Sequence, residues 1–307
     1  MEDLLRKIPT GLLSLFIIVL WGATFPAITL ALHHVSPYTL AGWRVLPAGI
    51  VVSLWALLQK LPLPSRRLWG AAAISAVFNV VMLYGGQIAA SAYLSPGLVA
   101  GLIYLQPILV ALFAHLWLGE SISRAKVSGI LLGLAGVGLI AFSAGTQASL
   151  LGIVLAVGAA IGWAVGTVYL KAHQEDSLVW FVALQFLLGG AAFAIVAIAV
   201  PGMPAQWSLA VLADIFFIMM GGTAGAWLLW LALLSRGEAS RVSTFLFGVP
   251  VVASFIGIFW FNETLSLRFV GGLVAVSCSI LLVNAKLGSR RRDPSAVFSE
   301  KSKVRKE

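Results

Sequence analysis

Apolar segments of about twenty residues recur along the whole chain, separated by short polar connections. A segment of that length crosses the hydrocarbon core of a bilayer as one helix, because each residue adds about 1.5 Å of rise. Proline, glycine, serine and charged residues gather in the connections, where they end one helix and open the next. The pattern predicts an all-α membrane protein with ten transmembrane helices. The expected spans are 10–31, 37–58, 68–90, 96–117, 124–143, 149–170, 177–200, 209–231, 241–261 and 266–285.

One stretch of the sequence occurs twice. Residues 95–123 match residues 238–266 without a gap, so that Pro107 falls on Pro250. A repeat at about half the chain length indicates one five-helix unit written twice, not a solenoid of short modules. The expected units are residues 1–146 and 147–287, followed by a basic, disordered tail over 288–307.

Lysine and arginine orient the predicted helices. If the N-terminus is cytoplasmic, the inner segments hold 18 of the 20 basic residues, and only Arg44 and Arg268 remain toward the other side. Positively charged connections stay on the cytoplasmic side, so both termini are expected there. Because five spans per unit is an odd number, the second unit crosses the membrane in the opposite direction. This is an inverted-topology repeat, which many secondary transporters use to build one site between the two halves.

The composition supports a membrane domain and excludes several other classes. Hydrophobic residues make up 60% of the chain and charged residues 10%, and the mean hydropathy is +1.01. The net charge of +9 comes from residues at helix ends and in the tail, which favours membrane topology over binding of nucleic acid. The single cysteine, Cys278, lies in an apolar run, so neither a disulfide framework nor a thiol metal site is expected. No cofactor is expected.

Several motifs resemble those of EamA-type transporters of the drug/metabolite transporter superfamily. They are WGATFPA in the first span, Arg44 in the second, YGGQIAASAYLSPGLVAGLIYLQPILVALFAHLWLGESIS across the third and fourth, and WLLWLALLSRGEASRVSTFLFGVPVVASFIGIFWFNETLS in the second unit. The resemblance implies a central cavity built by spans 1–4 and 6–9, with spans 5 and 10 at the periphery. Among members, the chain is most similar to amino-acid exporters of the YddG type. Other members carry nucleosides, sugars or organic cations.

Arg44 is the sharpest candidate for function. It lies about seven residues into the second span, roughly 10 Å below its outer end. Ionisable residues at such depth usually face the bundle interior or a water-filled cavity, where a guanidinium can hold a substrate carboxylate in bidentate fashion. The alternative is that Arg44 extends outward to the membrane surface or bonds helix-end carbonyls.

Other polar and aromatic residues are expected beside it. In the third span, Tyr84, Gln87 and Ser91 fall within about 60° of one another, whereas Asn79 lies off this stripe. Hydrogen bonding between helices would explain the stripe equally well. The candidate substrate-binding residues are Trp21, Arg44, Asn79, Tyr84, Gln87, Tyr104, Trp163, Gln185, Trp227 and Trp230.

Two prolines are candidate hinges. Each of Pro107 and Pro250 removes one backbone hydrogen bond from a span, and a kink of this kind can act as a gate pivot or remain static. Glu120 and Glu263, which close the repeated stretch, are interpreted as turn residues outside the chemistry.

The sequence carries no sign of an enzyme or a pump driven by ATP. It has no Walker motif, no HExxH and no paired intramembrane aspartates. Because no Asp or Glu lies in the middle of a span, facilitated diffusion or exchange is expected. We therefore expect a transporter of the cytoplasmic (inner) membrane that exports small metabolites, most of all amino acids, by alternating access. The alternatives are efflux of drugs or other organic metabolites and a membrane-embedded lipid-handling enzyme. The expected partners are the substrate and the lipid bilayer; a monomer is favoured and a dimer is the alternative.

Overall fold

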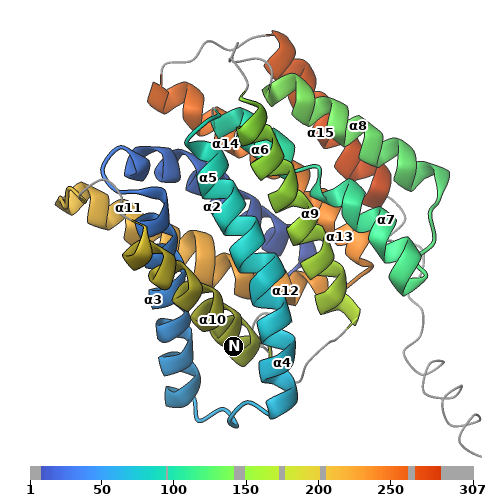
Figure 1. Cartoon of the computed structure of the whole chain (residues 1–307). Helices are drawn as coiled ribbons and strands as arrows, with labels where there is room; N and C mark the ends of the chain where they lie inside the picture. Colours follow the sequence, from blue (N-terminus) through green and yellow to red (C-terminus); the bar gives the residue numbers. More distant parts are fainter. Residues whose placement is uncertain are drawn as a thin grey trace, which may run out of the picture.

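The computed structural model describes residues 8–94, 96–141, 149–172, 177–200, 205–261 and 267–284. Within these ranges the chain is almost entirely helical and has no strand (Figure 1), as the hydropathy pattern predicts. Each of the ten expected spans coincides with one helix or with two or three consecutive helical segments. The continuous spans are α2 (Thr10–Leu32), α3 (Pro37–Leu58), α8 (Arg124–Ala141), α9 (Leu150–Ala172), α10 (Leu178–Ala199) and α15 (Leu267–Asn284).

Four spans are interrupted, and they are matching members of the two halves. The third and eighth contain π-helical segments, and the fourth and ninth break close to a proline. Pro107 cannot donate a hydrogen bond to the carbonyl of Ile103, and α6 ends at Ile103. The segments are α4 (Arg66–Ser75), η1 (Ala76–Gly85) and α5 (Gly86–Ser91); α6 (Pro96–Ile103) and α7 (Gln106–Leu118); α11 (Leu209–Met219), η3 (Met220–Gly225) and α12 (Ala226–Leu234); and α13 (Ala239–Thr244), η4 (Phe245–Phe247) and α14 (Gly248–Phe261).

The helix starts also match between the halves. Six serines in the described residues accept a hydrogen bond at a helix start from a backbone N–H three residues later, which satisfies a donor that the first turn leaves free, and four of them form matching pairs. Ser36 caps α3 and Ser177 caps α10, 141 residues later; Ser65 caps α4 and Ser208 caps α11, 143 residues later. The same local sequence signal therefore begins the same span in each half.

The surface is that of a membrane protein. Seven helical spans in the described residues are long and apolar enough to cross a bilayer, and shorter apolar helices lie in the last two spans. Large apolar side chains such as Ile198 (86% exposed) and Leu267 (91% exposed) point outward, whereas Trp227 and Arg44 are buried. A bilayer supplies the apolar surroundings that this surface requires, and the helices satisfy their own backbone groups.

Two helix pairs show how the halves are related. Figure 1 shows α8 beside α15, and α3 packs along α10. A Cβ on Gly49 would lie 2.7 Å from the backbone nitrogen of Leu187, and a Cβ on Gly190 would lie 2.6 Å from that of Leu46. Gly190 lies 141 positions after Gly49, and Leu187 lies 141 positions after Leu46. Exchanging the two halves therefore turns the contact of Gly49 with Leu187 into the contact of Gly190 with Leu46. The fold is thus an inverted repeat around a pseudo-twofold axis.

Below, the end of the bundle where α2 begins and α3 ends is called the inner end, after the predicted topology. The opposite end, where α2 ends and α3 begins, is called the outer end. The central spans of both halves surround the axis, and α8 and α15, which are equivalent spans, pair across the same axis at the periphery of the bundle (Figure 1).

Candidate functional site

Arg44 is fully enclosed in the middle of the bundle. Its exposed fraction is 1%. Its Nε donates to Thr223 Oγ1 at 2.9 Å, one Nη donates to Gln87 Oε1 at 3.0 Å, and its guanidinium carbon lies 3.7 Å from the centre of the Tyr84 ring. The predicted alternative, in which Arg44 extends to the membrane surface, does not occur in this structure.

The charge of Arg44 is not neutralised by any acidic side chain within the described ranges. Its partners are a hydroxyl, an amide oxygen and an aromatic face. A desolvated cation–π contact contributes roughly 2 kcal/mol, whereas moving a charge out of water costs several kcal/mol. The site is therefore electrostatically incomplete, and an anion beside Arg44 would complete it.

A small cavity adjoins Arg44. Its volume is about 20 Å³, which is room for about one water molecule. A metabolite needs more space, so this conformation is closed around the site. The lining residues are Trp21, Thr24, Phe25, Arg44, Leu83, Tyr84, Gln87, Ile103, Tyr104 and Trp163.

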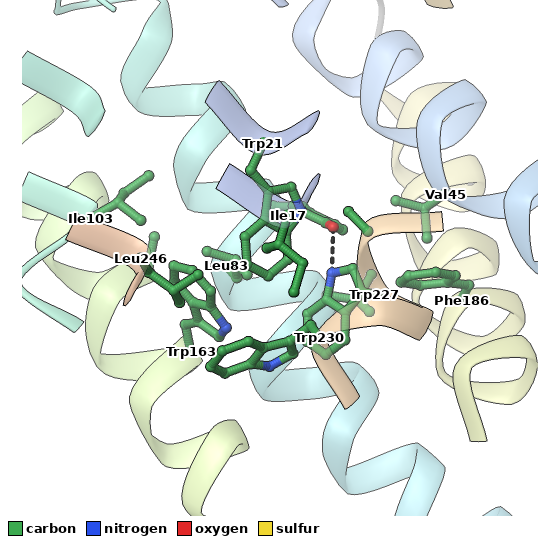
Figure 2. Packing of buried hydrophobic residues seen from close by; sticks show 14 of the residues in the cluster. Ile17, Trp21, Val45, Leu83, Ile103, Trp163, Phe186, Trp227, Trp230 and Leu246 are labelled. Atoms are coloured by element: carbon green, nitrogen blue, oxygen red, sulfur yellow. Dashed lines mark hydrogen bonds between the residues drawn. The ribbon is translucent and has the colours of Figure 1, made fainter. Parts of the chain in front are cut away.

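Aromatic rings form one side of this cavity. Trp21 packs edge-on against Trp163, with ring centres 5.3 Å apart, and Tyr104 packs edge-on against Trp163 at 5.6 Å. Trp227 and Trp230 lie close to Trp21 (Figure 2), at 6.4 and 5.9 Å. Trp21 Nε1 donates to the carbonyl of Gly222, whereas the Nε1 atoms of Trp163 and Trp230 are buried without a partner. The rings give an apolar wall and two free donors.

The site lies on the pseudo-twofold axis, because equivalent residues of the two halves touch there. Trp227 follows Tyr84 by 143 positions, and its Nε1 donates to the Tyr84 hydroxyl at 2.5 Å (dashed in Figure 2). Trp21 and Trp163, predicted from the sequence to occupy matching places, are also in contact. Each half thus contributes directly to one shared site.

A second polar cluster lies closer to the inner end. Ser75 Oγ donates to Gln185 Oε1 at 2.7 Å, and Asn79 Nδ2 donates to Ser75 Oγ at 2.9 Å. Gln106 Nε2 approaches Thr167 Oγ1 at 3.4 Å. All five side chains are fully buried. Because Gly166, next to Thr167, packs directly against Asn79, we treat the five residues together and call them the Gln185 cluster.

Charged residues join the two halves at the inner end. Glu120, after α7, accepts hydrogen bonds from the backbone N–H groups of Ala239 (2.7 Å) and Ser240 (3.3 Å) and from the Ser240 hydroxyl. Lys126 Nζ lies 2.7 Å from Ser240 Oγ and 3.1 Å from Glu238 Oε2. We call Glu120, Lys126, Glu238 and Ser240 the inner latch. Glu120 therefore joins the two halves as well as lying in the turn after α7, and its counterpart Glu263 lies outside the described residues.

The structure separates the predicted site residues into groups. Trp21, Arg44, Tyr84, Gln87, Tyr104 and Trp163 line the central cavity. Trp227 and Trp230 pack against that wall without lining it. Asn79 and Gln185 belong to the second cluster. Pro107 and Pro250 are buried where their spans are interrupted, and their role as hinges stays a prediction.

Sequence reasoning missed several polar residues. Thr24 lines the cavity and Thr223 holds Arg44, while Ser75, Gln106 and Thr167 complete the second cluster. Small hydroxyl residues are common in membrane helices, so residue type alone gives no signal for them.

The described residues contain no group of three or more His, Cys, Asp or Glu side chains that could hold a metal ion. Arg44 and the aromatic wall instead suit an organic anion with an apolar part. A guanidinium binds a carboxylate through charge-assisted hydrogen bonds, and aromatic faces accept a range of apolar groups.

Known proteins are similar to this chain in sequence and in fold. The model of the EamA-like transporter family matches residues 9–142 and 150–285. An uncharacterized transporter of Bacillus subtilis, YvbV, is 35% identical over 286 residues, which cover 92% of this chain and 93% of that protein. A probable amino-acid metabolite efflux pump of Escherichia coli is 25% identical, with 87% of this chain and 92% of that protein covered. A solved crystal structure superposes with a TM-score of 0.76 at 20% identity, covering 90% of this chain and 97% of the other.

Proposed function

Since the chain belongs to the EamA-like transporter family, we propose that it exports small carboxylate-bearing metabolites, amino acids above all, across the cytoplasmic membrane. The substrate carboxylate pairs with Arg44, and its apolar part lies against the aromatic wall. Transport proceeds by alternating access, with each end of the bundle opening in turn. Both termini face the cytoplasm.

The buried, unneutralised guanidinium carries this proposal. Two neutral acceptors and the Tyr84 ring fix Arg44 in one orientation without neutralising it. Among the residues that line the cavity there is one cation and no acidic side chain. An anion restores the balance of charge, whereas an organic cation would be repelled.

Two further observations support the proposal. The Escherichia coli relative is named for the efflux of amino-acid metabolites and is similar along most of both chains. The pseudo-twofold relation of the halves supplies two related conformations, one open to each face, through rocking of one half against the other.

The experiment is transport in proteoliposomes with a panel of radiolabelled amino acids, sugars, nucleosides and organic cations. We expect uptake of amino acids, and Arg44→Gln should lower the transport efficiency at least about tenfold, because a buried charge pair is worth ~2 kcal/mol or more. Arg44→Lys should recover only part of it, since an ammonium cannot reproduce the paired bonds of a guanidinium.

Arg66→Gln is the matched control, because it removes an exposed arginine from the first turn of α4 at the inner end. It should transport as the wild type does. Uptake of cations or sugars alone, unchanged in Arg44→Gln, would contradict the proposed substrate class.

A further inference from the structure

Gln185 occupies in the second half the position that Arg44 occupies in the first. The helices α3 and α10 begin 141 residues apart, at Pro37 and Leu178. The exchanged contacts of Gly49 with Leu187 and of Gly190 with Leu46 fix the same offset. Adding 141 to Arg44 gives Gln185, so the pseudo-twofold axis relates a buried cation on one side to a buried amide on the other.

The neighbours of Gln185 match the surroundings of Arg44. Asn79 is the equivalent of Gly222, whose carbonyl holds Trp21, and it packs against Gly166 as Gly222 packs against Thr24. Thr167 is the equivalent of Phe25, which lines the central cavity. The Gln185 cluster thus comes from the third, fourth, sixth and seventh spans. The equivalent spans in the other half are the eighth, ninth, first and second. The pseudo-twofold axis therefore relates the cluster to part of the wall of the Arg44 cavity. Because the halves are inverted, the cluster faces the inner end.

The cluster also has unused hydrogen-bonding capacity. Asn79 Oδ1, Gln106 Oε1 and Gln185 Nε2 are each buried without a partner. Buried amide atoms in native proteins nearly always have one. One free donor and two free acceptors in a closed, uncharged cluster point to a ligand or water that enters when the cluster opens.

We propose that the Gln185 cluster is a second, inner-facing subsite, which holds the polar end of the substrate while the inner end is open. This inference rests on the alternating access proposed above. Opening requires release of the inner latch, which in this structure joins Glu120 and Lys126 to Ser240. The substrate ammonium then meets the free oxygens of Asn79 and Gln106, and the carboxylate meets Gln185 Nε2 before it reaches Arg44.

The first half has an arginine at this position and the second half has a glutamine. The two faces should therefore bind the substrate with different affinities. Hydrogen bonds from a charged donor to a carboxylate are roughly twice as strong as those from a neutral donor. The inner subsite should therefore bind the same substrate more weakly, by about tenfold in half-saturation concentration. Weak binding on the loading side suits export from a compartment in which the metabolite is abundant.

The first test is chemical accessibility, which needs no substrate. With Cys278 replaced by serine, Ser75→Cys places a thiol inside the cluster. We expect a membrane-impermeant methanethiosulfonate to react with it from the inner face only, and faster when Glu120→Gln releases the latch. Gln59→Cys, at the exposed inner end of α3, is the control for full reaction from that face.

The second test compares half-saturation concentrations on the two faces, with an amino acid that the panel shows to be transported. Gln185→Arg should lower the value on the inner face about tenfold, and Gln185→Leu should raise it, with the outer value changed less. A purely structural role of Gln185 would not separate the two faces. Gln59→Leu removes an exposed amide from the same end and should change neither value.

The outcomes distinguish the two proposals. If Ser75→Cys stays unreactive from the inner face, even with Glu120→Gln and with Gln59→Cys fully labelled, or reacts from the outer face, the inner subsite is refuted. The inner subsite is also refuted if the Gln185 variants change the half-saturation concentration equally on both faces. Inner accessibility without transport of any panel amino acid refutes only the proposed substrate class.

Discussion

At the residue scale, Arg44 is fixed by groups that leave its charge unbalanced. Gln87 Oε1 accepts from the guanidinium, and the Tyr84 hydroxyl already accepts from Trp227. The remaining hydroxyls in the cavity lining belong to Thr24 and Tyr104 and are neutral. A substrate carboxylate therefore finds a countercharge in the site, whereas a substrate ammonium finds only neutral oxygens and aromatic faces.

This arrangement predicts how substrate analogues compete. If phenylalanine is transported, 3-phenylpropionate, which lacks the ammonium, should inhibit its transport within about threefold of unlabelled phenylalanine itself. Phenylalaninamide, which lacks the carboxylate, should be at least about tenfold weaker, a difference of ~1.4 kcal/mol or more. Inhibition of labelled uptake in proteoliposomes measures both. Strong inhibition by the amide and none by the acid would contradict the charge balance described for Arg44.

At the scale of helices, close packing at glycines holds the halves together. The backbones of α3 and α10 approach so closely at Gly49 that a Cβ there would lie 2.7 Å from a backbone nitrogen. Small residues permit such contacts in membranes, where packing takes over much of the role that the hydrophobic effect has in water.

Gly49→Ala should therefore destabilise the protein by about 1–3 kcal/mol, because the helices must separate. Gly42→Ala is the matched control in the same helix, since its Cβ would meet no atom closer than 3.8 Å. Thermal unfolding of the purified protein in detergent measures both. Equal melting temperatures for the two variants would show that the contact is not tight.

The inner latch also acts between helices, because it joins the connection after α7 to the start of α13. Glu120→Gln combined with Lys126→Met removes its charges. We expect the inner ends of α7 and α12, which belong to different halves, to move apart, as measured by electron paramagnetic resonance between spin labels at the exposed residues Leu116 and Ser235. With Arg66→Gln as the control, an unchanged distance distribution in the double variant would show that the latch does not hold this end closed.

At the scale of the whole molecule, the sequence predicts the fold closely and the site in part. Span boundaries follow from hydropathy because lipid tolerates only helices with apolar surfaces. Arg44 was found because a charge inside a span is rare. The partners of Glu120 lie more than a hundred residues away in the other half, and no local pattern links them. Likewise, Ser91 belongs to the predicted stripe yet bonds the carbonyl of Gln87 in its own helix.

The distribution of acids gives a further whole-molecule prediction. No Asp or Glu lies in the middle of a span. A carboxyl group that carries protons across the membrane is therefore missing from the sequence, and an imposed pH gradient should not drive accumulation of a neutral amino acid. Uptake into proteoliposomes with and without the gradient, and with a proton ionophore, measures this. Accumulation that the ionophore abolishes would show proton coupling.

The contact of equivalent residues across the pseudo-twofold axis has a consequence for how such a protein evolves. In a dimer of identical five-helix chains, one mutation changes the transport pathway on both faces of the membrane at once. A guanidinium at position 44 would then be present twice. With both units in a single gene, each copy of a position mutates alone. The equivalent positions 44 and 185 have diverged to arginine and glutamine. Selection can therefore adjust substrate uptake on one face and substrate release on the other independently.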